Sequence, residues 1–222
     1  MASNWLDTGD EPFVRLRGAV VVAGGFPLLS GVDLDIERAS LTVLTGANGA
    51  GKTSLLRLLG GLVALSAGTG RVAGVDLATG DRRELRRRVG WLGHEGSFYD
   101  DLTARENLTF AARALRLPLG GLDEALLRVG LSHRATTPAK ALSAGQRRRL
   151  ALAWLLVRRA ELWLLDEPYA ALDDEARVLF DEVIDAALVG GATVVVSAHQ
   201  ALGVRRVSTV VRLAGGHVGE DS

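Results

Sequence analysis

Residues 46–54 have the types and spacing of a phosphate-binding loop. They fit the pattern G-x-x-x-x-G-K-[ST], directly after an apolar run that ends at Thr45 and at the start of a helical pattern. The glycines let successive backbone N–H groups point into one concavity, and the helix adds the positive end of its dipole. We therefore predict a triphosphate site, with Lys52 on the β- and γ-phosphates and the Thr53 hydroxyl on Mg²⁺. The predicted loop residues are Gly46, Ala47, Asn48, Gly49, Ala50, Gly51, Lys52, Thr53 and Ser54.

A pair of acidic residues follows another apolar run. Residues 162–165 have the composition of a buried strand, and Asp166 and Glu167 come directly after it. At the end of a strand beside the phosphate loop, Asp166 would hold Mg²⁺ and Glu167 would accept a proton from the attacking water. Such a general base contributes about 10²- to 10⁴-fold. An exposed acidic turn with a purely structural role is the alternative, and it is less favoured because the chain also has a phosphate loop.

Short apolar runs alternate with longer segments of helical period, which favours an α/β fold with helices on the faces of a sheet. Glycine turns separate the first three runs, at residues 13–22, 31–36 and 40–45, and we expect these runs to form an antiparallel β arm beside the main sheet. The other expected elements are helices at 52–59 and 173–187, a hairpin at 68–77 that turns at Gly74, and strands at 89–93, 162–165, 192–197 and 207–213.

Residues 103–159 differ from the rest because their pattern is almost wholly helical. Thr103 stands where a helix would begin, and Glu106 has the spacing of a capping box. We interpret residues 95–159 as a helical subdomain inserted in the sheet domain, which residues 1–94 and 160–222 would form. The predicted fold class is an α/β P-loop NTPase with a RecA-like core, an antiparallel β arm and an inserted α-helical subdomain, all in one domain.

Composition excludes several classes of protein. The 26 basic and 26 acidic residues cancel, which excludes a simple polybasic nucleic-acid binder. The chain has no cysteine for a thiolate metal site, and no apolar run approaches the 18 residues of a membrane span. Residues 82–88 carry five arginines that could contact nucleic acid or lipid head groups. A solvated helix face is the favoured interpretation, because the acidic residues Asp81 and Glu84 reduce the net positive charge of this segment.

Three further segments resemble the ATP-binding cassette (ABC) family. Residues 142–146, Leu-Ser-Ala-Gly-Gln, resemble its Leu-Ser-Gly-Gly-Gln signature with Ala144 in place of one glycine. Residues 170–173 resemble its D-loop, and His199 falls at its switch histidine. The resemblance implies that His199 contacts the γ-phosphate and helps to orient the water. It also implies nucleotide-binding roles for Ser143, Gly145, Gln146 and Asp173.

Two ABC copies pack head to tail, so the resemblance also implies a homodimer. ATP held by Lys52 and Thr53 of one copy would be capped by Ser143 and Gly145 of the other. Gly145 and Gln146 are expected to open a helix at 147–157, whose first backbone donors would face the anion. A two-fold arrangement closes on itself and creates two equivalent sites. Taken alone, Ser143 is equally well a helix cap.

One loop distinguishes a branch of the family. Most ABC proteins have glutamine after the strand that precedes the helical subdomain, whereas this chain has His94. Together with Leu-Ser-Ala-Gly-Gln at 142–146 and Ser-Ala-His-Gln at 197–200, His94 makes the chain similar to the haem exporter ATPases of cytochrome c biogenesis, the CcmA family. We place His94 in the catalytic set. Because imidazole titrates at a pKa of about 6.5, His94 should make activity sensitive to pH.

The resemblance implies an ATPase, with ATP and Mg²⁺, that drives a separate membrane permease. The permease would be CcmB-like, together with CcmC-like components. The subunit would dock on the cytoplasmic face of the inner membrane through residues 94–101 and the helical subdomain. We expect no direct haem site and no nucleic-acid partner, since the four histidines are isolated or belong to ATPase motifs.

Two alternatives and one local question stay open. The chain could serve a drug or lipid exporter, or it could be a soluble ABC protein that acts on nucleic acid or ribosomes. The aromatic residue on which adenine stacks in most of the family aligns near Ala23, and Phe26 is close enough to replace it. A core or turn role for Phe26 is at least as consistent with the sequence.

Overall fold

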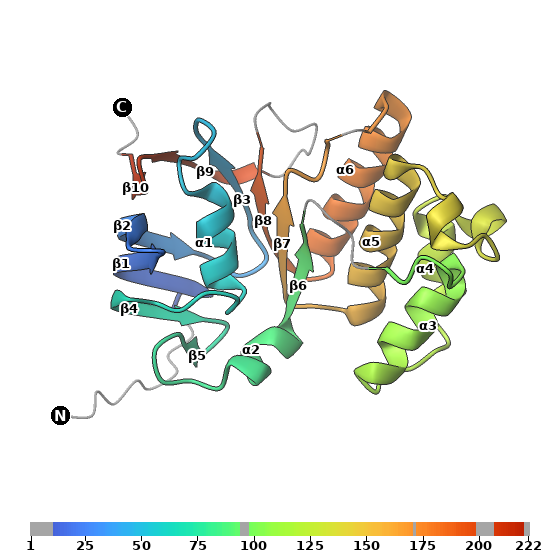
Figure 1. Cartoon of the computed structure of the whole chain (residues 1–222), viewed down its shortest axis with the longest axis horizontal. Helices are drawn as coiled ribbons and strands as arrows, with labels where there is room; N and C mark the ends of the chain where they lie inside the picture. Colours follow the sequence, from blue (N-terminus) through green and yellow to red (C-terminus); the bar gives the residue numbers. More distant parts are fainter. Residues whose placement is uncertain (1–10, 94–97, 171, 199–206, 220–222) are drawn as a thin grey trace.

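The computed structural model describes residues 11–93, 98–170, 172–198 and 207–219, and Figure 1 shows the arrangement of their elements. The strands are β1 (Val14–Ala23), β2 (Phe26–Ile36), β3 (Leu41–Thr45), β4 (Ala67–Val72), β5 (Val75–Asp76), β6 (Val89–Leu92), β7 (Leu162–Asp166), β8 (Thr193–Ser197), β9 (Val207–Ala214) and β10 (His217–Val218). The helices are α1 (Lys52–Leu59), α2 (Arg82–Arg88), α3 (Ala104–Ala114), α4 (Leu122–Arg128), α5 (Ala144–Arg158) and α6 (Asp174–Val189).

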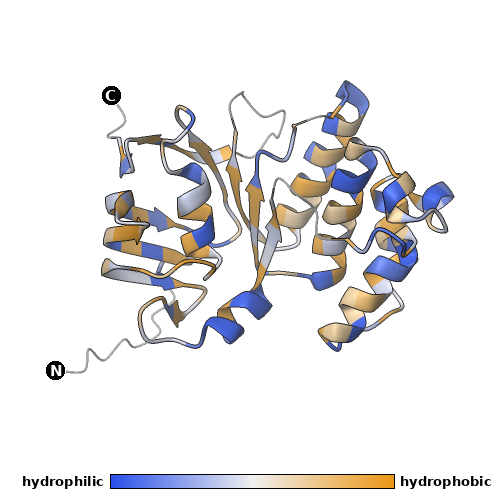
Figure 2. Cartoon of the chain, in the orientation of Figure 1, coloured by the Kyte–Doolittle hydropathy of each residue, from blue (hydrophilic) through white to orange (hydrophobic). Residues whose placement is uncertain are grey.

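The central sheet has the strand order β10-β9-β3-β8-β7-β6, and all of its pairs are parallel except β9 with β10. Every residue of β7 and β8 is buried, as expected for parallel strands whose two faces are both covered. Figure 2 shows that most of each strand is hydrophobic. The carboxyl ends of β3, β7 and β8 therefore meet at one edge of a rigid sheet.

Helices cover this sheet on both faces. On one face, α1 packs between the central sheet and a second sheet with the order β2-β1-β4-β5, and its leucines join one apolar cluster with residues of β1, β2 and β7. On the other face, α5 and α6 pack in a second cluster that also contains residues of α3 and α4. The consecutive residues Leu164 and Leu165 of β7 point to opposite faces, so Leu164 belongs to the first cluster and Leu165 to the second. These layers confirm the predicted fold class.

The strand at residues 40–45 was predicted wrongly as part of the antiparallel arm. It forms β3, which pairs in parallel with β8 and β9 at the centre of the main sheet. The physical reason is its burial: residues 41–44 are all buried, so both faces of the strand need cover. The arm instead takes β4 as its third strand, antiparallel to β1, and the predicted hairpin at Gly74 joins β4 to β5.

The regular elements described between β6 and β7 are all helical. They comprise α3, α4, α5 and two short 3-10 turns, Ser132–Arg134 and Ala139–Ala141. Thr103 and Glu106 form the predicted capping box of α3. The signature helix α5 begins at Ala144, three residues before the predicted start, because Ser143 caps it. The subdomain boundaries at residues 95 and 159 stay a prediction, and no described helix has the length and apolarity to cross a membrane.

The arginine run of residues 82–88 forms α2, which has one buried residue, Leu85. Figure 2 shows this helix as a hydrophilic segment. Asp81 caps its first turn, and Glu84 pairs with Arg88. The structure thus agrees with the interpretation of this run as a largely solvated helix.

Gly46 fixes the direction in which the chain leaves β3. Its φ is +137°, and a Cβ atom placed on it would lie 2.2 Å from the backbone oxygen of Leu213 in β9. No side chain fits there without displacing the neighbouring strand. The close approach of these backbones therefore positions the loop that follows.

Replacing Gly46 with alanine tests this constraint. We expect Gly46→Ala to lower the free energy of unfolding by about 2–4 kcal/mol, because it adds a backbone clash to the cost of a positive φ. Gly74→Ala is the control, since Gly74 has a φ of +79° but open space around its Cβ position. Chemical denaturation of both variants measures the difference. Equal losses would contradict the clash.

Candidate nucleotide-binding and catalytic site

The phosphate loop ends where α1 begins. Gly51 is the N-cap residue of α1, has a φ of +104° and provides no side-chain cap. The first N–H groups of a helix have no intrahelical acceptor, so those of α1 remain available to an anion. Their partial positive charge adds to that of the helix dipole. The local backbone is therefore suited to phosphate.

The ammonium group of Lys52 lies inside this loop. Lys52 is only 6% exposed, and its Nζ donates to the backbone oxygens of Gly46 at 2.7 Å and Ala47 at 3.0 Å. Within the ranges that the structure describes, Lys52 forms no ion pair. A buried charge is costly unless it is paired, and here carbonyl dipoles alone compensate it. An anionic ligand would supply the missing negative charge.

The loop borders a cavity of about 750 Å³. Glu167 lines the same cavity, so the structure brings a carboxylic acid from the end of β7 to the predicted phosphate site. The lining residues are Pro27, Leu28, Asn48, Gly49, Ala50, Gly51, Lys52, Thr53, Ser54, Glu167, Gly215 and Gly216.

Oxygen ligands for a divalent cation converge beside the cavity. Thr53 Oγ1 lies 2.9 Å from Asp166 Oδ2 and 3.2 Å from Asp166 Oδ1. Asp166 is buried, at 8% exposure, and also accepts a hydrogen bond from the Ser197 hydroxyl at 2.7 Å. A carboxylate next to a threonine hydroxyl is a donor set that suits Mg²⁺ bound together with substrate phosphates. The side chains present therefore fit the predicted cation.

Glu167 has an unusual backbone conformation. Its φ is +48°, which costs a non-glycine residue about 1–2 kcal/mol. Its N–H donates to the Ser197 hydroxyl at 2.8 Å, and its carbonyl accepts from the N–H of Ala170 at 3.2 Å. Strained backbones that are held in this way occur preferentially at functional sites. The geometry is consistent with the role of general base predicted for Glu167.

The signature residues and the described D-loop residues are not among those that line this cavity. Ser143 Oγ accepts from the N–H of Gln146 at 3.2 Å, and Gln146 Oε1 accepts from the N–H of Ser143 at 3.0 Å. Gly145 is the second residue of α5. Asp173 caps α6 by accepting from the N–H of Ala176 at 2.8 Å. Within this chain Ser143, Gln146 and Asp173 therefore take part in helix caps, away from the cavity of the phosphate loop.

Two predicted catalytic residues, His94 and His199, lie outside the described residues, so their roles stay predictions. Phe26 is 74% exposed, which rules out a core role for this side chain. It precedes Pro27 and Leu28, which line the cavity. An exposed aromatic residue beside the cavity agrees with a surface on which a base can stack.

Sequence reasoning missed Ser197 and the glycine pair at 215–216. Ser197 links Asp166 to the backbone of Glu167, a contact that neither its place at the end of β8 nor the Ser-Ala-His-Gln segment indicated. Gly216 accepts from the N–H of Ser30 at 2.9 Å and donates to the oxygen of Ala50 at 3.1 Å, so it ties β2 to the phosphate loop. The Gly-Gly dipeptide predicts a turn but does not indicate this contact.

Known proteins resemble the chain in sequence. The family model of ABC transporters matches residues 29–170. The cytochrome c biogenesis ATP-binding export protein CcmA of Nitrobacter winogradskyi is 42% identical over 189 residues, which covers 85% of this chain and 92% of that protein. CcmA of Cupriavidus pinatubonensis is 36% identical over 208 residues and covers 93% and 91%.

Solved structures agree with the fold. A dimeric ATP-binding cassette, MJ0796, in a post-hydrolysis state bound to ADP and Pi, has a TM-score of 0.83 and 25% identity over 94% of this chain and 97% of that chain. The ATP binding subunit of an ABC transporter has a TM-score of 0.85 and 23% identity over 95% and 89%. On the matched family and these relatives, the chain belongs to the ABC transporter family, in the branch of the cytochrome c biogenesis ATP-binding export proteins.

Proposed function

We propose that this chain is the ATP-hydrolysing subunit of a bacterial transporter that exports or delivers haem for cytochrome c maturation. The main support for hydrolysis is the single cavity in which the buried Lys52, the start of α1 and Glu167 lie together. The support for the cargo is the identity with proteins named for ATP binding and export in cytochrome c biogenesis.

In the proposed reaction, Lys52 exchanges its two carbonyl contacts for the β- and γ-phosphates of ATP. The N–H groups at the start of α1 hold the same phosphates and orient the terminal one. Thr53 and Asp166 would hold Mg²⁺, which neutralises phosphate charge when bound. Glu167 accepts a proton from the water that attacks the γ-phosphate. His199 keeps its predicted contribution to orienting the water, and His94 keeps its predicted place in the catalytic set.

We further propose that a complete site needs two copies of the chain, packed head to tail. In this chain the cavity contains the phosphate loop and Glu167 but none of Ser143, Gly145 or Asp173. A second copy would present the start of its α5 to the bound nucleotide. MJ0796, with 25% identity and nearly full coverage, is dimeric in its ADP-bound form.

Replacing the proposed base tests the hydrolysis. Glu167→Gln keeps the size of the side chain but removes the proton acceptor, so ATP binding should be unchanged and turnover should fall by about 10²-fold or more. Nucleotide affinity and steady-state ATPase rates measure the two effects separately. A variant that kept more than about a tenth of the wild-type rate would rule out this role for Glu167.

Mixing two inactive variants tests the shared site. Lys52→Ala removes the phosphate contact, and Ser143→Arg blocks the signature, so each homodimer should be inactive. In a mixed dimer, one of the two sites combines an intact Lys52 with an intact Ser143. An equimolar mixture should therefore recover about a quarter of the wild-type rate. No recovery after subunit exchange, with dimers present by light scattering, would contradict the head-to-tail arrangement.

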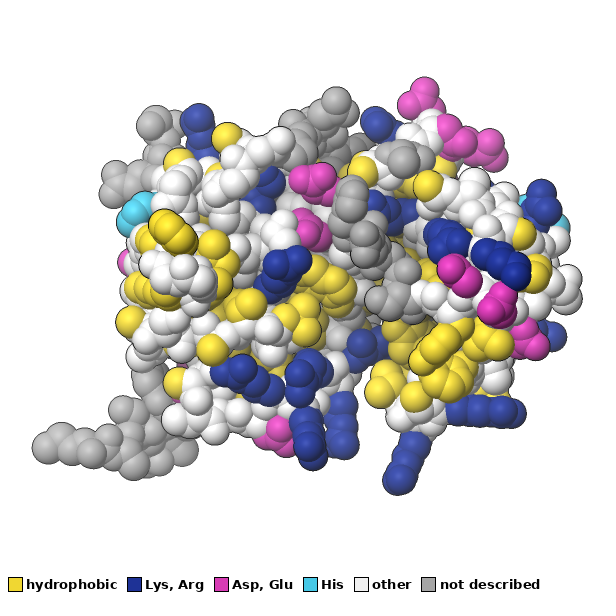
Figure 3. All heavy atoms as spheres, in the orientation of Figure 1, with side chains coloured by type: hydrophobic (Ala, Val, Ile, Leu, Met, Phe, Trp, Pro, Cys, Tyr) yellow, Lys and Arg dark blue, Asp and Glu magenta, His cyan; other side chains and the backbone are white. Residues whose placement is uncertain are grey.

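The membrane partner is proposed to bind an exposed apolar groove of about 300 Å³ on the helical side of the chain. The rings of Tyr99 and Phe110 pack edge to face at 4.9 Å while remaining 57% and 49% exposed. Leu115 and Trp154 extend the groove. Figure 3 shows hydrophobic side chains gathered over this part of the molecule, in the region of α3 in Figure 1. An apolar helix of a CcmB-like permease, with CcmC-like components, would bury these rings at the cytoplasmic face of the inner membrane.

Placing a charge in the groove tests this docking. Phe110→Glu should remove at least nine-tenths of the chain that sediments with membranes of cells that express the partner permease, because a buried unpaired carboxylate opposes binding. The ATPase rate of the isolated subunit should not change. Val189→Glu is the matched control, since Val189 is 69% exposed on α6, outside the groove. Equal membrane loss in both variants would refute the groove as the docking site.

A further inference from the structure

Arg148 is a half-buried side chain of α5 to which the proposed hydrolysis gives no role. It lies five residues after Ser143, which caps the same helix. Its Nη1 donates to the backbone oxygen of Gly93 at 2.6 Å, and its Nη2 approaches the backbone oxygen of Glu167 at 3.4 Å. One guanidinium therefore bridges the signature helix and two segments at the carboxyl edge of the central sheet.

The two carbonyl groups belong to neighbouring strand ends. Gly93 follows β6, Glu167 follows β7, and these strands pair in parallel with Leu92 opposite Leu165. Helix α5 docks closely on β6, since a Cβ atom on Gly90 would lie 2.6 Å from Leu155 Cδ2. The planar fork of an arginine suits two acceptors side by side, which a single ammonium group cannot match.

The charge of Arg148 lies near the reacting groups. Burial lowers the pKa of Arg148, while the carboxylates of Asp166 and Glu167 act in the opposite direction. Arginine stays protonated under such shifts because its reference pKa is so high. The hydrogen bonds of the guanidinium among the described residues go to the backbone oxygens of Gly93 and Glu167, so Arg148 holds the main chain of Glu167 in addition to attracting its carboxylate.

We propose that Arg148 is a positioning residue that ties the signature helix to the backbone of Glu167 and so sets the position of its carboxylate. The inference rests on the proposed function, because it acts through Glu167 as the base. A displacement of the start of α5, such as engagement of Ser143 by a second copy, would be transmitted to Glu167 through this side chain. Arg148 would thereby link assembly of the shared site to hydrolysis.

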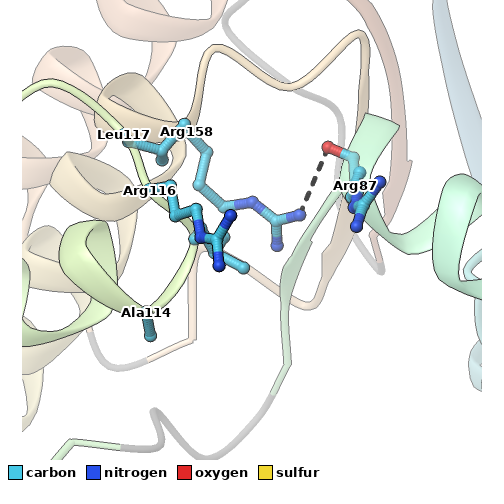
Figure 4. Close-up of a pocket in the computed structure, with 6 residues that line it drawn as sticks. Arg87, Ala114, Arg116, Leu117 and Arg158 are labelled. Atoms are coloured by element: carbon cyan, nitrogen blue, oxygen red, sulfur yellow. Dashed lines mark hydrogen bonds between the residues drawn. The ribbon is translucent and has the colours of Figure 1, made fainter.

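Arg158, ten residues further along α5, provides a matched control. It is also half-buried, burial also lowers its pKa, and its Nη2 also donates to backbone oxygens, those of Arg86 and Arg87 at the end of α2. Figure 4 shows the contact with the oxygen of Arg87, and both residues line a pocket of about 470 Å³ together with Arg116. Ten residues of helix separate the two arginines by about 15 Å. Arg158 thus anchors α5 with the same chemistry at the end away from Glu167.

The experiment compares steady-state ATPase kinetics of Arg148→Gln, Arg148→Lys and Arg158→Gln as full-length chains. Arg148→Gln should lower kcat by about 10- to 100-fold and leave KM within about twofold, because positioning is lost while phosphate binding is kept. Arg148→Lys should be intermediate, and Arg158→Gln should stay within about twofold of wild type. Thermal unfolding shows whether each variant is folded at the assay temperature.

A double variant separates positioning from general support of the fold. In single-turnover assays, adding Arg148→Gln to Glu167→Gln should cause less than about a twofold further loss, since both changes act through one group. The proposal is overturned if Arg148→Gln keeps more than half of kcat, if Arg158→Gln loses as much, or if the two losses multiply. If Glu167→Gln alone keeps its rate, the proposed base fails instead, which is a distinguishable result.

Discussion

The candidate site depends on a concentration of positive charge that the described residues do not neutralise. The ammonium of Lys52 and the start of α1, which has no side-chain cap, face the same cavity, and the described partners of the ammonium are two backbone carbonyl oxygens. Such an arrangement persists only if the surrounding fold holds it, because burial of an unpaired charge is unfavourable. Three contacts provide that support. Helix α1 packs between two sheets, the backbone at Gly46 lies close to β9, and Gly216 donates a hydrogen bond to Ala50.

The acidic half of the site is held by hydroxyl groups. Ser197 donates to Asp166 and accepts from the N–H of Glu167, so one side chain of β8 fixes both acids at the end of β7. Thr53 contributes the second hydroxyl contact to Asp166. Asp166 and Ser197 are opposite each other at the ends of the paired strands β7 and β8, so the strand register sets their relative positions. The strained backbone of Glu167 is maintained by this rigidity.

Sequence reasoning succeeded where local pattern determines structure. The loop of residues 46–54 has a spacing that only a strand, a turn and a helix can satisfy, and α1 begins and ends where predicted. It failed where tertiary contacts determine the position of a strand or a side chain. The apolar run at 40–45 reads equally well as an arm strand, and only its burial on both faces places it in the central sheet. Ser197 and Gly216 contribute to the site through contacts between strands far apart in sequence, which local pattern does not encode.

The signature of this chain departs from its family at Ala144, and the structure explains why the change is tolerated. Ala144 is the first residue of α5, where the backbone is already helical and the side chain is exposed. Alanine has less conformational freedom than glycine, which in a helix interior favours the helix by about 1 kcal/mol, so alanine makes the start of the helix less flexible. In the capping box, Ser143 Oγ accepts a hydrogen bond from the N–H of Gln146. The N–H groups of Ala144 and Gly145 have no intrahelical acceptor. In the proposed dimer, a stiffer first turn would hold those two donors in a fixed direction and so favour binding of the nucleotide held by the other copy.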